Sequence, residues 1–98
     1  MEEHDPLIAA LEIMSTKQRW DIIRCIMMGH TRFNQIKKEC GMSSAALART
    51  LRHFQDSGLI IRKVNGGKVP DTEYSLTNVG HGFAKVVDAM AKWGKRIG

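Results

Sequence analysis

The fold of this chain is decided by residues 41–74, GMSSAALARTLRHFQDSGLIIRKVNGGKVPDTEY. A glycine turn with capping serines precedes Leu47, Leu51 and Phe54, whose spacings of four and three define one apolar helix face. This pattern predicts a helix over about 44–57. Two β-prone runs on either side of Asn65-Gly66-Gly67 then predict a hairpin over about 59–76. A helix followed by a basic hairpin is the layout of a winged helix-turn-helix, a mainly α fold with a small β-hairpin.

The preceding residues predict three short helices, at about 6–14, 17–28 and 32–40. Asp5-Pro6 suits the start of the first, and Gly29 and Gly41 suit the ends of the second and third. Thr31 is the expected cap of the third helix. With 98 residues and one continuous pattern, the sequence predicts a single domain over 1–98.

A final helix is predicted over about 77–97. Its apolar residues follow at spacings alternating between four and three, namely Val79, Phe83, Val86, Met90, Trp93 and Ile97. Such a seam favours a partner helix, so the two terminal helices are expected to form a homodimer. The expected interface comprises Leu7, Leu11, Phe83, Val86, Met90, Trp93 and Ile97. Alternatively the stripe packs on its own domain, and Gly80, Gly82 and Gly94 argue against a long free coil.

Charge is concentrated on the segment expected to read DNA. The net charge is +5, and residues 31–68 carry eight basic and two acidic side chains. A polyanionic partner, double-stranded DNA, explains such a concentration. A solvated basic surface is the plainer explanation.

Candidate DNA-binding residues follow from their positions on these elements. Small residues and Arg49 on the first turns of the 44–57 helix are expected near base edges, with Arg49 bidentate to guanine. Arg52 and His53 are expected at phosphates, and Arg32 as a phosphate clamp at a helix N-terminus. The complete set is Arg32, Ser43, Ser44, Ala45, Arg49, Arg52, His53, Arg62, Lys63 and Lys68, the last three being hairpin residues expected at a minor groove or the backbone.

Several protein classes are disfavoured. Aliphatic and sulfur-containing runs such as residues 25–28 are too short to span a bilayer, and the acidic start is unlike a signal peptide. We therefore expect a cytoplasmic protein with no membrane partner. Neither paired metal-ligand spacing nor a nucleophile–base pattern occurs, which predicts no metal, no cofactor and no enzymatic activity.

Two alternatives to a plain DNA-binding regulator stay open. Cys25 or Cys40 could make the protein thiol-responsive, with Cys25 expected off the core face and Cys40 on it. The winged helix could instead be a protein-interaction module, although its basic face lacks the apolar anchors typical of one.

With these motifs in place, the chain resembles the HxlR-type winged-helix transcriptional regulators. The resemblance rests on Arg32-Phe33-Asn34, Gly41-Met42-Ser43 through Leu47, Leu51-Arg52, Gly58-Leu59, and Glu73-Tyr74-Ser75-Leu76-Thr77 with Gly80, together with Trp20 and Trp93-Gly94. It implies a homodimeric DNA-binding regulator, most commonly a repressor. Its terminal helices would dimerise, and the helix over about 44–57 (the reader helix) and the hairpin over about 59–76 (the wing) would contact DNA. Residues 15–28 also resemble ArsR-type and MarR-type regulators, and the family's N-terminal sensing cysteine is missing.

Overall fold

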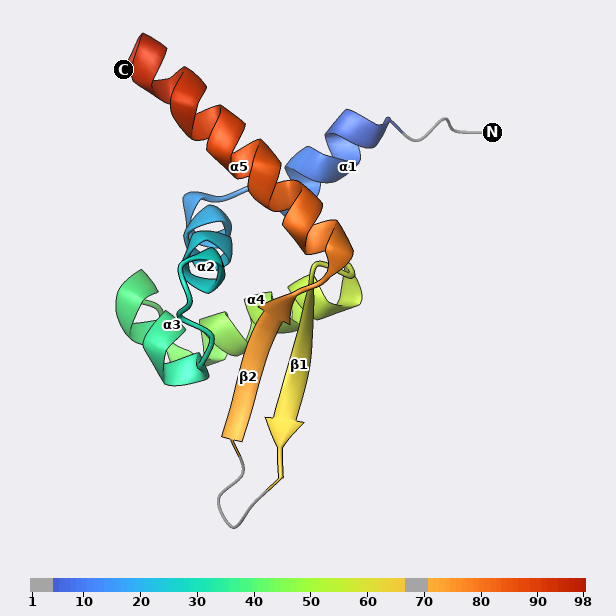
Figure 1. Ribbon diagram of the computed structural model, residues 1–98, viewed down its shortest axis with the longest axis vertical. Coiled ribbons are helices and arrows are strands. Elements are labelled where there is room, and N and C mark those ends of the chain that lie inside the picture. The colour runs from blue at the N-terminus through green and yellow to red at the C-terminus, as the bar shows by residue number, and fades with distance from the viewer. Residues whose placement is uncertain (1–4, 67–70) are drawn as a thin grey trace.

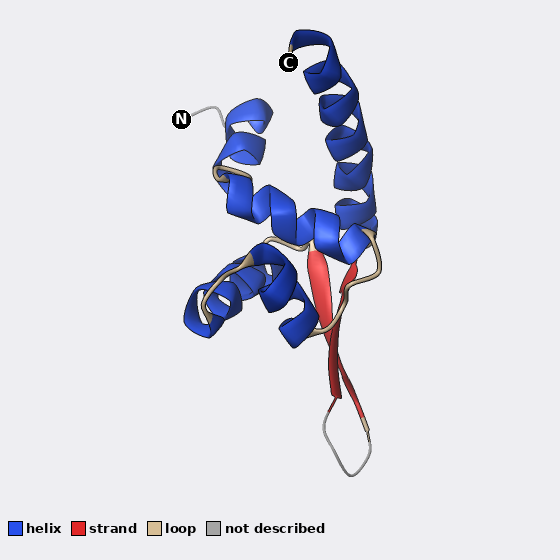
Figure 2. Ribbon diagram, turned by 90° about the vertical axis from the view of Figure 1, so that its left-hand side faces the viewer, coloured by secondary structure: helices blue, strands red, loops and turns tan. Residues whose placement is uncertain are grey.

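The computed structural model describes residues 5–66 and 71–98 and consists of helices and one antiparallel hairpin (Figure 1). The elements are α1 (Pro6–Ile13), α2 (Lys17–Met27), α3 (Phe33–Cys40), α4 (Ser44–Asp56), β1 (Ile60–Asn65), β2 (Asp71–Leu76) and α5 (Asn78–Ile97). The predicted fold class, a winged helix-turn-helix, is confirmed. The hairpin projects from one end of the molecule, and the last turns of α5 lie at the other end (Figures 1 and 2).

Side-chain caps define where the helices begin. The Asp5 carboxylate accepts the Leu7 backbone N–H at 2.9 Å, with Pro6 at the first helical position. The third helix departs from expectation, because its N-cap is Arg32 and not Thr31. The Thr31 carbonyl instead accepts the Tyr74 backbone N–H at 2.8 Å. Thr31 is thus held beside the hairpin as extended chain.

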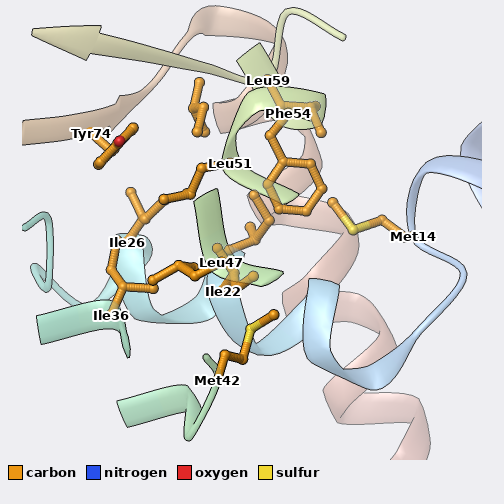
Figure 3. Close-up of a cluster of buried hydrophobic side chains, with 12 residues drawn as sticks. Met14, Ile22, Ile26, Ile36, Met42, Leu47, Leu51, Phe54, Leu59 and Tyr74 are labelled. Atoms are coloured by element: carbon orange, nitrogen blue, oxygen red, sulfur yellow. The ribbon is translucent and has the colours of Figure 1, made fainter. Parts of the chain in front are cut away.

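The core lies between α2, α3, α4 and the base of the hairpin (Figure 3). Phe54 of α4 is fully buried, as are Ile22 of α2 and Ile36 of α3. Burying one such side chain contributes about 1.5–3 kcal/mol. The other core residues are Met14, Ile23, Ile26, Met42, Leu47, Leu51, Leu59, Ile60 and Tyr74. This shared core sets the position of α4 relative to the preceding helices.

The hairpin is joined to α3 as well as to α4. Its strands pair from Ile60 opposite Leu76 to Asn65 opposite Asp71. An isolated antiparallel bridge between Arg32 and Glu73 attaches the chain just before α3 to the two-stranded hairpin. The wing therefore starts from a fixed base between two helices.

Most of the predicted seam on α5 is uncovered. Trp93 is 56% exposed and Met90 49% exposed, and Leu7 and Leu11 of α1 are similarly open. Phe83 differs, because its ring centroid lies 5.0 Å from that of Trp20 and it packs against its own core.

Within residues 5–66 and 71–98, no helix has both the length and the apolarity needed to cross a membrane.

Gly80 allows α5 to start directly against the base of the hairpin. The Leu59 carbonyl accepts the Thr77 backbone N–H at 3.0 Å. A Cβ on Gly80 would lie 2.2 Å from the same carbonyl oxygen, whereas a Cβ on Gly82 would meet nothing within 4 Å. From the sequence alone, Gly80 is expected only to lower the helix propensity of α5. In the structure it permits the close contact with the Leu59 carbonyl.

We expect Gly80→Ala to lower the free energy of unfolding by about 2–3 kcal/mol, because backbone must move to admit the methyl group. Gly82→Ala is the matched control, and it should raise stability by about 0.5–1 kcal/mol through helix propensity. Urea denaturation followed by circular dichroism measures both. Equal stability of Gly80→Ala and the parent would contradict the close contact.

Candidate nucleic-acid interface

Helix α4 has one buried face and one exposed basic face. Leu47, Leu51 and Phe54 are at most 1% exposed, so the helix cannot rotate without emptying the core. Arg49 and Arg52 consequently point to solvent. The basic face predicted from the sequence is therefore available on the surface of the molecule.

The N-terminus of α4 follows a tight turn from α3. Gly41 has a φ of 63°, a left-handed conformation that favours glycine, and Met42 is buried beside the core. The Ser43 hydroxyl accepts the Ala46 backbone N–H at 3.2 Å and caps the helix. Ser44 and Ala45 are exposed on the first turn. These small residues allow close approach of another surface to the helix N-terminus.

Two predicted phosphate-binding residues share one cleft. Arg52 of α4 and Arg62 of β1 line a space of about 390 Å³ between helix and hairpin. Arg62 stands opposite Tyr74 in the strand register. Among the side chains that the structure describes, no acidic one lines this cleft, whose other lining residues are Phe33, Ala48, Gln55, Thr72 and Tyr74. Sequence reasoning missed Gln55, Thr72 and Tyr74 as lining residues, and only Tyr74 carried a signal, as part of the motif Glu73-Tyr74-Ser75.

Arg32 has an additional role that the sequence did not reveal. Its guanidinium lies 3.2 Å from a carboxylate oxygen of Glu73, and both side chains are partly exposed. An exposed pair of this kind contributes about 0–1 kcal/mol. Arg32 thus joins the start of α3 to the wing, and any phosphate that it binds must compete with Glu73.

The remaining predicted residues differ in their surroundings. Lys63 is exposed on β1, opposite Glu73 in the register. Lys68 lies outside the described residues. His53, expected on the outward face, is instead half-buried, and its Nε2 atom is buried without a hydrogen-bond partner. The physical reason is its position on the flank of α4, where the ring tilts against Phe54 with centroids 6.2 Å apart.

The two cysteines meet between α2 and α3. Their Sγ atoms lie 3.6 Å apart as free thiols, although 15 residues separate them in the chain. The expectation that Cys25 lies off the core face is wrong, because it packs against the core beside Cys40. Burial, followed by the contact with Cys25 and its charge, raises the pKa of the Cys40 thiol to about 12. Among the residues placed by the structure, no cluster of three or more His, Cys, Asp or Glu side chains could hold a metal ion.

A capped helix with an exposed basic face, set beside a basic hairpin, defines the winged helix-turn-helix class of DNA-binding transcriptional regulators. Residues 13–98 match the HxlR-like helix-turn-helix family, and the chain belongs to that family. An HTH-type transcriptional regulator of Methanothermobacter thermautotrophicus is 35% identical over 83 residues. That match covers 82% of this chain and 63% of the relative, so the chain spans under two thirds of the relative's length.

Solved structures of similar proteins have the same fold. The redox regulator HypR in its reduced form superposes with a TM-score of 0.85 at 26% identity, covering 94% of this chain and 92% of the other. A MarR-family transcriptional regulator from Porphyromonas gingivalis W83 superposes with a TM-score of 0.80 at 28% identity, covering 97% and 94%. The expected resemblance to HxlR-type regulators is confirmed.

Replacing the cap of α4 should weaken the helix locally. We expect Ser43→Ala to cost about 1 kcal/mol of stability, since the Ala46 N–H loses its acceptor. Ser44→Ala, at the next position, should change stability by less than about 0.5 kcal/mol, because no cap is removed. Thermal unfolding of the two variants checks the difference, and an equal loss in both would place the cap elsewhere.

Proposed function

We propose that this protein is a sequence-reading repressor that binds double-stranded DNA as a homodimer in the cytoplasm. One observation carries the proposal: Arg49 and Arg52 lie on the exposed face of α4, and Arg52 shares a cleft with Arg62 of the wing. The local excess of positive charge suits the phosphates of a duplex. Membership of the HxlR-like family supports the same proposal of DNA binding.

In this proposal the first turns of α4 enter the major groove. The small side chains of Ser43, Ser44 and Ala45 let the backbone approach the base edges closely. Arg49, one turn further, is long enough to donate two hydrogen bonds to a guanine. Base recognition by so few large side chains predicts that DNA shape also contributes to specificity.

The cleft between α4 and the wing supplies the phosphate contacts. Arg52 and Arg62 approach it from two different elements, so a single backbone segment can be held from both sides. Lys63 lies on the neighbouring position of the exposed wing and adds charge toward the backbone or minor groove. Contacts of this kind set the register of the protein on DNA without reading sequence.

The dimer is proposed to form through α1 and α5. Met90 and Trp93 belong to an exposed apolar stripe on α5, and Leu7 and Leu11 are exposed apolar residues of α1. An apolar groove of about 360 Å³ between the two helices, lined by Ile13 and Phe83 among others, continues this stripe. A two-fold pair would bury the stripe and present two α4 helices to a palindromic operator. Occupying such an operator blocks polymerase, which is the basis for proposing repression.

We expect Arg49→Ala to lose about 1–3 kcal/mol of operator affinity and to relax preference at one base pair. Fluorescence anisotropy on duplex fragments, each at several salt concentrations, measures this loss. Lys17→Ala is the control, because Lys17 is an exposed basic residue at the start of α2, outside α4 and the wing. Wild-type binding by Arg49→Ala would mean that α4 does not read the bases as proposed.

Arg62→Ala gives a contrasting pattern within the same assay. It should weaken all duplexes to a similar degree and reduce the salt slope by about one unit, because it removes a phosphate contact. A loss confined to one sequence would instead make Arg62 a base-reading residue.

Met90→Lys should shift the protein from dimer to monomer, because it places a charge in the centre of the apolar stripe. Met28→Lys controls for the loss of an exposed methionine, since Met28 is 76% exposed and lies off the stripe. Sedimentation equilibrium gives the molar mass of each variant. A monomeric parent would remove the homodimer from the proposal.

A further inference from the structure

The thiols of Cys25 and Cys40 form a pair across two helices. Cys25 lies in the last turn of α2, and Cys40 is the last residue of α3. With 3.6 Å between the Sγ atoms, the two thiols are in contact. Both side chains are only partly buried, so a small solute can reach them. Two accessible thiols in contact can be joined as a disulfide when an oxidant is supplied.

The two cysteines are not equivalent chemically. Cys40 is held protonated, since burial, the sulfur contact and the nearby charges of Cys25, Asp21 and Glu39 raise its pKa to about 12. Cys40 is therefore disfavoured as the attacking sulfur of the pair. The thiolate is the form that attacks an oxidant. The pair thus contains an attacking sulfur, Cys25, and a resolving sulfur, Cys40.

We propose that Cys25 and Cys40 are a redox modification site, which a hydroperoxide converts to an intrachain disulfide that weakens operator binding. In the first step the Cys25 thiolate attacks the O–O bond, forming a sulfenic acid, and the alcohol or water leaves with the other oxygen. In the second step Cys40 sulfur attacks Cys25 sulfur as its proton passes to the departing hydroxide, releasing water. The two thiols lose two electrons in total, and the peroxide gains them.

Closing the disulfide has a mechanical consequence for α4. The sulfur atoms must approach by about 1.5 Å to reach bonding distance. Cys40 is followed directly by the Gly41 turn, and the Ser43 cap of α4 is three residues away. Because Met42 between them is buried in the core, a displacement at Cys40 is passed on to the start of α4. The regulatory part of this inference rests on the proposed DNA-binding function of α4.

The bond itself is tested without DNA. The parent is treated with hydrogen peroxide, its remaining thiols are alkylated under denaturing conditions, and the chain is cut with trypsin. Cleavage after Arg24, Arg32, Lys38 and Arg49 separates the two cysteines into different peptides. We expect one disulfide-linked pair of these peptides from a chain that runs as a monomer on a non-reducing gel. Alkylation of both cysteines, or a disulfide-linked dimer, would overturn the inference.

Single substitutions assign the two roles. Cys40→Ser should leave Cys25 as a sulfenic acid that a dimedone probe traps, because no resolving sulfur is present. Cys25→Ser should leave Cys40 reduced and alkylated under the same treatment. The reverse pattern would contradict the assignment of Cys25 as the attacking residue.

The effect on DNA is then measured with the reduced and oxidised parent. We expect oxidation to weaken operator binding several-fold, dithiothreitol to restore it, and Cys40→Ser to show no comparable loss. Failure of the reduced parent to bind any duplex would remove the proposed function while leaving the disulfide result standing. Equal affinity of the reduced parent and the mapped disulfide form would overturn the regulatory part of the inference.

Discussion

The close approach of α5 to the carbonyl of Leu59 is the contact on which the arrangement of this molecule depends. That oxygen accepts the Thr77 N–H, and a side chain at position 80 would collide with it. The end of α4, the base of the hairpin and the start of α5 are therefore joined at one point. From this point the hairpin extends in one direction and α5 in the other (Figure 1). The wing and the apolar stripe are consequently separated in space.

This separation gives the chain two surfaces of opposite character. Around α4 and the wing, Arg49, Arg52, Arg62 and Lys63 are exposed, whereas one stripe of α5 and part of α1 expose apolar side chains. Phosphate contacts are screened by salt, while apolar burial is driven by release of water and depends little on salt. Two such surfaces at different ends of one small domain can be occupied together. Their arrangement is compatible with a protein that pairs and binds DNA at the same time.

Helix α2 connects these surfaces, because it packs against α3 and α5 as well as against the core. The cysteine pair lies on its side toward α3, and Cys40 directly precedes the turn that leads into α4. A disulfide between Cys25 and Cys40 would link α2 to the end of α3, directly before the turn into α4. The partial burial of both thiols keeps them accessible, and the raised pKa of Cys40 makes one sulfur the attacking group and the other the resolving group.

The sequence by itself determined the element order, the fold class and the family. These features depend on local rules: caps at Asp5 and Ser43, the spacing of Leu47, Leu51 and Phe54, and the glycines at the hairpin turn. It also placed Arg49 and Arg52 on the outer face of α4, because helix periodicity fixes opposite faces. Only the tertiary structure decided the pairings between distant residues: Arg32 with Glu73, Arg52 beside Arg62, Phe83 on Trp20, and Cys25 against Cys40. Periodicity within a helix or strand indicates which way a side chain faces. Which residues the side chain contacts depends on how the helices and strands pack, and their packing is determined by the core as a whole.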